Sequence, residues 1–592
     1  MREFKNPYFL STGAPVTQAC PYATPVDEYR AAFADRSQPF LHYYHLEDGG
    51  IKRRSFTRGG FWDLACLGAA CLADRGLSKG DRLVHGFSDN SPYDLIFRLS
   101  AMLVGCVPVT INWQADDNDR LVYKAKLTGS KLFLYDSGFR KRFEEIKPNL
   151  SGIKYFHAEA IEKFDPSTAW APPPLSYEDE KMIIFTAGTT GLPKGVSLSH
   201  RSYLANRMTF EEYFRLPLSE PLDLVLVNPL HHTNSSALSD WGMRRKGTAI
   251  HLIRRYSTAY WKILTEVAGN KRGLLVAPMV PRHIDFLESL IETSLLPVDQ
   301  NDLMEALSQT DILIGSAPVG PTTIGRILKY SRRFPRVRFG STETCLQVMA
   351  TPTTLTEEEM KSAFEAGWTH GFRGEKQTGY YIGREHYPFT EVKIVKAIDP
   401  GKDGYMQPCK SGQPGYLITR GANLMSGYAG QDEATEKVFR EGWYVGLRDI
   451  GFTLEGKDGC PDYYWISRDS ALLIRGGANY ACEQVAADLS RVLVEDFSLK
   501  PGQFKLAVIG LRIRSEHDDS CCVTIELGEE AACMEEELRA TFIKKASGKV
   551  SKGSFPDYVR FAPIPLSFKG AVLIPRLRQE FEDYLKEQAK TL

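Results

Sequence analysis

The segment from Ile183 to Gly195 constrains the fold most, because it joins a short apolar run to a loop rich in glycine and threonine. Ile183, Ile184 and Phe185 are β-favouring residues, and the loop that follows contains Thr186, Gly188, Thr189, Thr190, Gly191, Lys194 and Gly195. Glycines let the backbone approach a ligand closely, and hydroxyls with one ammonium suit a polyphosphate. The loop is not a Walker A motif, since Lys194 follows a proline rather than a glycine. The residues alone also allow a surface turn.

The first third of the chain alternates between strand and helix patterns. Apolar residues at three- and four-residue steps predict helices over 55–76 and 95–103, and short apolar runs predict strands over 80–84, 106–111 and 131–136. This alternation is typical of an α/β fold with largely parallel strands. Residues 1–50 show little periodicity, and we expect them to lie over the first core.

Composition limits the class of protein. The 592 residues are 43% hydrophobic, enough for two or more domains, and 73 basic residues balance 73 acidic ones. The zero formal net charge disfavours nucleic acid or an anionic membrane as partner. No apolar run reaches 18 residues, no signal peptide is evident, and eleven scattered cysteines are typical of reduced thiols. We therefore expect a cytoplasmic protein without stable membrane insertion.

The glycine loop resembles the phosphate-binding signature of the adenylate-forming superfamily, which includes acyl-CoA synthetases, aryl-acid ligases, peptide-synthetase adenylation domains and beetle luciferases. The usual form is Thr-Ser-Gly-Thr-Thr-Gly-x-Pro-Lys-Gly, and this chain departs from it only at Ala187. Further segments resemble the family's motifs in order over roughly residues 50–585. The resemblance implies that ATP binds to Thr186, Gly188, Thr189, Thr190, Gly191 and Lys194.

The resemblance assigns the rest of the nucleotide site to four later segments. Gly315, Ala317 and Pro318 are similar to a segment beside adenine and the acid, and Phe339, Gly340, Ser341, Thr342 and Glu343 match the Tyr-Gly-x-Thr-Glu motif. It implies that Phe339 stacks on adenine, that Thr342 contacts the α-phosphate and that Glu343, with Thr186, holds Mg²⁺. Asp449 would accept the ribose hydroxyls, and Arg468 would reach the ribose or a phosphate.

The resemblance also implies three catalytic residues: His232, Glu343 and Lys569. His232 would gate the acid pocket, although two adjacent histidines on a turn are usually just solvated. The order Lys569-Gly570 reverses the family's usual Gly-Lys, so Lys549 and Lys552 are alternatives. Gly340 stands where acetate-type ligases place a pocket-closing Trp, which predicts a longer acid. The polar run from Thr233 to Ser236 either lines the pocket or caps a helix.

The fold class implied is α/β, with a large multi-sheet N-terminal adenylation domain and a small mobile α+β C-terminal domain. We expect the first to span residues 1–467, a hinge at 468–470 and the second over 471–592. The hinge residue is Ser470 by spacing, or Asp469 if the alignment shifts by one. Gly476 and Gly477 belong to a loop that meets the CoA pantetheine in the family after domain rotation.

The function implied is ATP-dependent activation of a small-molecule carboxylic acid to an acyl-adenylate, with Mg²⁺, followed by transfer to CoA. One alternative is a stand-alone adenylating enzyme that passes the acyl group to a carrier protein or an amine. Another is a degenerate adenylate-binding protein, an idea supported by the departures at Ala187, Arg448, Ser470 and Lys569. We expect a monomer or homodimer.

Overall fold

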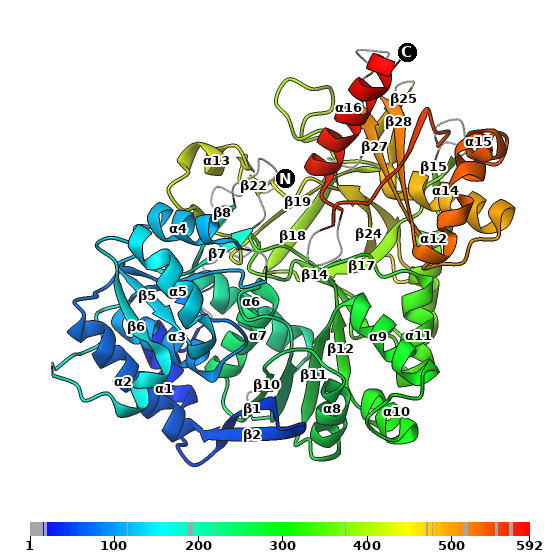
Figure 1. Ribbon diagram of the computed structural model, residues 1–592. Helices are drawn as coiled ribbons and strands as arrows, with labels where there is room; N and C mark the ends of the chain where they lie inside the picture. Colours follow the sequence, from blue (N-terminus) through cyan, green and yellow to red (C-terminus); the bar gives the residue numbers. More distant parts are fainter. Residues whose placement is uncertain are drawn as a thin grey trace.

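The computed structural model contains two large sheets and a small C-terminal unit (Figure 1). It describes Val16 and residues 20–114, 116–167, 169–186, 193–217, 219–372, 375–468, 472–475, 478–511, 513, 519–550, 554–566 and 572–591. Within these ranges no helix is both long and apolar enough to cross a bilayer. The fold is α/β, as the sequence predicts, with a large multi-sheet part followed by the small α+β unit.

The first sheet has seven strands, and its central pairs are parallel. Its order is β20 (Gly427–Tyr428), β8 (Lys194–Ser199), β7 (Glu180–Thr186), β4 (Val107–Thr110), β3 (Arg82–Gly86), β5 (Leu132–Tyr135) and β6 (Lys154–His157). Its helices are α2 (Arg58–Asp74), α3 (Pro92–Val104), α4 (Asn118–Leu127) and α5 (Arg140–Ile146). Ser91 caps the start of α3, and Gly105 ends it in the left-handed region at φ 77°. The helices and strands predicted here are confirmed within a few residues.

The second sheet has fifteen strands, and its strand pairing changes from parallel to antiparallel half way across. Its order is β2 (Gly50–Thr57), β1 (Pro39–Glu47), β10 (Thr248–Ile253), β9 (Leu222–Leu226), β11 (Leu274–Met279), β12 (Asp311–Ile314), β13 (Arg336–Phe339), β14 (Met349–Ala350), β17 (Tyr380–Glu385), β24 (Pro461–Arg468), β23 (Asp449–Glu455), β19 (Gly415–Gly421), β22 (Trp443–Tyr444) and β21 (Phe439–Arg440), with β18 (Thr390–Val395) beside β19. Pairing is parallel from β1 to β13 and antiparallel from β13 onward.

The described part of residues 1–50 packs on the first core, as expected, but it is more regular than its weak periodicity indicates. Residues 25–32 form helix α1 (Pro25–Ala32), and residues 39–47 form β1, which is hydrogen-bonded on both sides. The sequence of Pro39–Glu47 lacks the strict alternation of apolar and polar residues that indicates a strand, because polar and aromatic side chains occupy positions on both faces.

Helices cover both faces of the second sheet. On β9, Leu224 packs into the cluster of α3 and α7 (Thr233–Arg244), whereas Val225 packs on the other face against α8 (Ala259–Gly269) and α10 (Gln300–Ser308), as alternation along a strand requires. The remaining helices of this part are α6 (His200–Tyr213), α9 (Pro281–Glu292), α11 (Pro321–Ser331), α12 (Glu357–Thr369) and α13 (Asp432–Glu436), and a small hairpin pairs β15 (Gly371–Phe372) with β16 (Glu375–Lys376).

The C-terminal unit, orange to red in Figure 1, is built on a three-stranded sheet. Its strands are β27 (Phe504–Leu511), β28 (Ser520–Leu527) and β29 (Tyr558–Phe561). Helix α14 (Cys482–Phe497) precedes them, α15 (Glu535–Ala546) connects β28 to β29, and α16 (Ile574–Thr591) follows them. The hairpin of β25 (Leu472–Arg475) and β26 (Ala478–Ala481) precedes them. Leu473, Leu489 and Val523 belong to one buried cluster of this unit. The domain and hinge boundaries remain a prediction.

A buried charge cluster joins α1, β7 and α7. Asp240 lies 2.9 Å from the Lys181 ammonium and 2.7 Å from the Arg244 guanidinium, and it accepts a hydrogen bond from the Tyr29 hydroxyl. Arg244 also pairs with Glu28 at 2.5 Å. Burial would raise the pKa of Asp240, but Arg244 and Lys181 lower that pKa to about 2.

Asp240→Asn should lower the free energy of unfolding by about 3–5 kcal/mol, because the buried Lys181 loses its carboxylate and Arg244 keeps only Glu28. Since the pKa of Asp240 is depressed in the folded chain, this contribution is complete above the unfolded pKa, near 4, and disappears between about pH 4 and 2. Denaturant unfolding measures both effects. The matched control is Asp63→Asn, whose exposed pair with Arg36 should contribute less than about 1 kcal/mol. Equal effects of the two substitutions would contradict the prediction.

Candidate functional site

The two ends of the glycine loop lie opposite each other in a β-hairpin. Strands β7 and β8 are antiparallel, and Thr186 pairs with Lys194 in their register. Both side chains are half-buried. The predicted phosphate-binding residues Gly188, Thr189, Thr190 and Gly191 lie outside the described residues. The loop therefore starts and ends at one place, with a hydroxyl and an ammonium on neighbouring strands.

Tyr428 connects the lysine of this loop to the predicted metal-binding carboxylate. Strand β20 pairs with β8 and places the Tyr428 ring 4.9 Å from the Lys194 ammonium. The Tyr428 hydroxyl donates to Glu343 Oε1 at 3.2 Å, and the backbone N–H of Met425 donates to the Glu343 carbonyl at 2.8 Å. Burial and the nearby Glu343 carboxylate raise the pKa of Tyr428, so the hydroxyl keeps its proton. The structure thus brings together Lys194 and Glu343, residues 149 positions apart in the numbering.

The segment from Phe339 to Glu343 is a tight loop at the end of β13. The N–H of Ser341 donates to Thr344 Oγ1 at 2.8 Å, and the N–H of Leu346 donates back to the Ser341 carbonyl at 3.1 Å. A Cβ at Gly340 would stand 1.6 Å from the Leu346 carbonyl oxygen, so this position requires glycine. The Thr342 hydroxyl accepts from the Thr233 hydroxyl at 2.9 Å, which joins the loop to the start of α7.

Gly315 lies beside this loop on the neighbouring strand. Ile314 pairs with Val337, and a Cβ at Gly315 would stand 2.8 Å from the Arg338 carbonyl oxygen. Ala317 and Pro318 follow Ser316, which has φ 70°, and all three are exposed. The predicted adenine segment and the Phe339 loop therefore occupy the same edge of the sheet.

Asp449 is buried at the start of β23. Its Oδ1 accepts from Trp465 Nε1 at 2.8 Å and from Arg468 Nε at 3.3 Å. Burial raises the pKa of Asp449 even though Arg468 opposes it. Burial raises the pKa of the Tyr444 phenol, and the Glu343 and Asp449 carboxylates raise that pKa further. The nearby Arg448 has φ 50° and pairs with Asp399 at 3.6 Å, so the replacement of glycine there leaves Asp449 in position.

His232 lies on the turn between β9 and α7, where it precedes the first helical residue. The His231 ring stands 4.2 Å from the His232 ring and meets Trp113 edge-on at 5.5 Å. His231 is buried, and His232 is half-buried. The two histidines are therefore packed rather than solvated.

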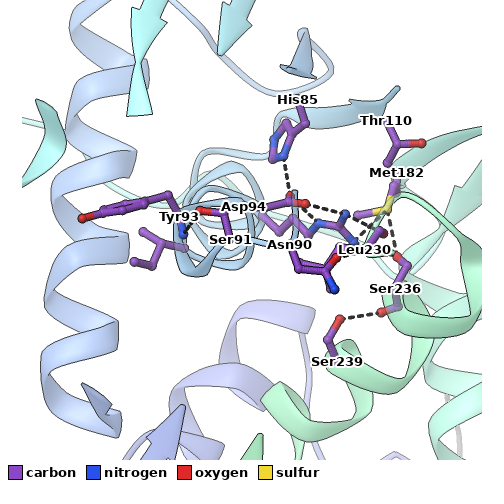
Figure 2. A network of polar contacts seen from close by, with 12 residues as sticks. His85, Asn90, Ser91, Tyr93, Asp94, Thr110, Met182, Leu230, Ser236 and Ser239 are labelled. Atoms are coloured by element: carbon purple, nitrogen blue, oxygen red, sulfur yellow. Dashed lines mark hydrogen bonds and ion pairs between the residues drawn. The ribbon is translucent and has the colours of Figure 1, made fainter. Parts of the chain in front are cut away.

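A buried polar network contacts the chain on both sides of His232, at Leu230 and at Ser236 (Figure 2). Asp94 accepts from Arg98 Nε at 2.8 Å and lies 2.9 Å from the His85 ring. Arg98 donates to the Leu230 carbonyl at 2.8 Å and to the Ser236 hydroxyl at 3.0 Å, one contact on each side of His232. Burial would raise the pKa of Asp94, but Arg98 and His85 lower it to about 2. Sequence reasoning missed this network, because its members are scattered over β3, α3 and α7.

Several predicted site residues cannot be placed. Lys569, Gly476, Gly477, Lys552 and both hinge candidates, Asp469 and Ser470, lie outside the described residues. Lys549 is described and pairs with Asp496 at 2.5 Å. Over the described ranges no group of three His, Cys, Asp or Glu side chains is arranged to hold a metal. One carboxylate, Glu343, near a lysine fits Mg²⁺, which is usually bound through one or two carboxylates and the substrate's phosphates.

The class of this protein follows from its match to a family model. Residues 32–429 match the family model of the AMP-binding enzyme, so the chain belongs to that family. Its relatives include the medium-chain acyl-CoA ligase ACSF2, mitochondrial, of Mus musculus, which is 26% identical over 88% of this chain and 82% of its own length. The 2-succinylbenzoate–CoA ligase of Bacillus velezensis is 24% identical over 71% of this chain and 74% of its own length. The ATP-bound structure of MatB from Rhodopseudomonas palustris superposes with a TM-score of 0.70 at 20% identity, covering 94% of this chain and 99% of that one.

Arg98→Lys should raise KM for the acid substrate several-fold while KM for ATP stays nearly constant. Lysine keeps the charge next to Asp94 but cannot reach the Leu230 carbonyl and Asp94 together, because it lacks the arginine fork. Steady-state kinetics with each substrate varied in turn will check this. Equal increases in the two KM values would show that the network supports the whole fold rather than the His232 turn.

Proposed function

We propose that the chain activates a carboxylic acid with ATP to an acyl-adenylate and transfers the acyl group to CoA. The observation that carries the proposal is the contact of Tyr428 with both Lys194 and Glu343, on a chain of the AMP-binding enzyme family. A cation and a hard carboxylate near one loop suit a triphosphate and its metal. Two relatives, at 26% and 24% identity, bear the name of CoA ligase.

In the first step, a carboxylate oxygen of the acid attacks the α-phosphorus of ATP. The bond between the α-phosphorus and the bridging oxygen breaks, and pyrophosphate leaves with the electron pair. Both reactants are anions, so the site must neutralise negative charge. Lys194 binds the outer phosphates, Asp449 accepts the ribose hydroxyls, and Thr342 contacts the α-phosphate. Mg²⁺, bound by Glu343 with Thr186, would neutralise charge on the phosphate oxygens.

Lys569 is proposed to stand between the carboxylate and the α-phosphate, where it stabilises the charge of the transition state. In the second step, the CoA sulfur attacks the acyl carbon and the carbon–oxygen bond to AMP breaks. The thiol proton goes to solvent, and AMP leaves as the phosphate anion. The segment of Gly476 and Gly477 would line the path of the pantetheine, after a movement of the C-terminal unit.

The identity of the acid substrate does not follow from the type of reaction. Three relatives are named for a medium-chain acyl group, 2-succinylbenzoate and sulfoacetate, and three different names do not select one substrate. The cytoplasmic location predicted from the cysteines also stays a prediction, since the mouse relative is named as mitochondrial.

Acid-dependent exchange of pyrophosphate into ATP tests the first step directly. With a panel of fatty, aryl, hydroxy and dicarboxylic acids, we expect exchange with one class and a loss of about 10²–10³-fold in Lys569→Ala and in Glu343→Gln. Lys549→Ala is the control, because that lysine already pairs with Asp496. Exchange in Lys569→Ala at the wild-type rate, with loss in the control, would move the catalytic role to Lys549.

Acceptor competition tests the second step. We expect CoA to release AMP from the preloaded acyl-adenylate faster than hydroxylamine or a carrier protein does. Preference for an amine or carrier protein would replace CoA ligation with the stand-alone adenylating reaction. Binding of ATP without exchange on any acid would favour a degenerate adenylate-binding protein.

A further inference from the structure

Arg338 is a buried arginine directly before the Phe339 loop. On β13, Val337 packs against the helices of one sheet face, so Arg338 points to the opposite face, where Tyr213 of α6 lies. Only 6% of Arg338 is exposed. A Cβ at Gly315 would stand 3.3 Å from Arg338 Cγ, so the glycine leaves room for the arginine stem next to the strand.

The charge of this arginine is not compensated within the described part of the chain. Neither Nη1 nor Nη2 has a hydrogen-bond partner there. The neighbouring Tyr213 hydroxyl is occupied, since it donates to the Thr351 carbonyl at 2.6 Å. Arg336, two residues earlier on the same face, pairs with Asp311 at 3.2 Å. Burial lowers the pKa of Arg338 to about 10, which still leaves the guanidinium charged at neutral pH.

A buried guanidinium without a partner is costly, because its hydration has been lost and nothing replaces it. Tyr213 does not supply a negative charge, since burial raises its pKa above its ordinary value. His386, whose ring lies 5.4 Å from the Tyr213 ring, has a pKa lowered to about 3 by burial and is neutral. Among the described residues none supplies an anion to Arg338, which makes a bound ligand a candidate source of one.

The position of Arg338 connects it to the acid rather than to the nucleotide. Phe339, assigned to adenine, precedes the loop that Thr233 of α7 contacts through Thr342. Tyr213 of α6 lies near Arg338, and α6 packs against α7 through the hydrogen bond between Tyr203 and Ser236. His232, assigned to the acid pocket, precedes the first residue of α7.

We propose that Arg338 binds a second anionic group of the acid substrate, so that the preferred substrate is a dicarboxylic acid. The inference rests on the proposed function, because it assigns the far end of the acid site. One carboxylate is adenylated, and the other pairs with the guanidinium through two parallel N–H···O bonds. The guanidinium is enclosed, so the acid would enter with a rearrangement of neighbouring side chains.

Pyrophosphate exchange with matched acids tests the proposal. Dicarboxylic acids of three to ten carbons are compared with monocarboxylic acids of equal length. The wild type should prefer one dicarboxylic acid, and Arg338→Met should lower the ratio of the two kcat/KM values by roughly 100-fold. Arg338→Lys should restore part of this ratio. Arg336→Met, the control on the same strand, should leave the ratio unchanged.

Thermal unfolding supplies a readout that does not depend on catalysis. Without ligand, Arg338→Met should raise the apparent Tm by roughly 2–4 °C, because an uncompensated buried charge is removed. The dicarboxylic acid alone should stabilise the wild type and not the variant, whereas ATP should stabilise both. A lower Tm in Arg338→Met together with an unchanged substrate ratio would overturn the proposal and make the arginine structural.

The two proposals fail in different ways. If no acid supports exchange in the wild type, the adenylation reaction is refuted. If monocarboxylic acids support exchange and dicarboxylic acids neither react nor shift Tm, the reaction stands and the role of Arg338 is refuted. A shift of Tm by inorganic phosphate equal to that by the dicarboxylic acid would also refute it, because the site would then select any small anion.

Discussion

The pairing of β7 with β8 is the constraint on which the rest of the site depends. It returns the chain to its starting point after the glycine loop, so Thr186 and Lys194 stand opposite each other. Strand β20 then adds to β8 and supplies Tyr428, and Tyr428 contacts the loop of Glu343. Three segments, at residues 186–194, 343 and 428, therefore meet through the hydrogen bonds of one sheet edge and one tyrosine hydroxyl.

Many helices and strands could be predicted from the sequence, because the apolar patterns that indicate them are local. Apolar runs next to glycine predicted α3 and β4, because the same residues determine both burial and the chain's turning points. The resemblance named Thr186, Lys194 and Glu343, and the structure places them in one region. It also named Lys569, Gly476 and Gly477, which lie outside the described residues and remain predictions.

The features that sequence reasoning missed are those made by contacts between distant positions. Arg98 acts through the Leu230 carbonyl, and backbone atoms have no signature in a sequence. Arg338 reads as an ordinary strand residue beside Arg336, and only the fold shows that one has Asp311 and the other has no carboxylate among the described residues. The strand over residues 39–47 was missed because its pairing with β10 depends on residues two hundred positions away.

The placement of Tyr428 between Lys194 and Glu343 has a consequence for the order of events at this site. If the ammonium and the carboxylate formed a direct salt bridge, a nucleotide would first have to break it. With an aromatic ring against the ammonium and its hydroxyl on the carboxylate, each charge is held by a weaker, neutral neighbour. The site is thus a separated pair of charges, which in the proposed function would meet the complementary pair of a polyphosphate and its bound cation.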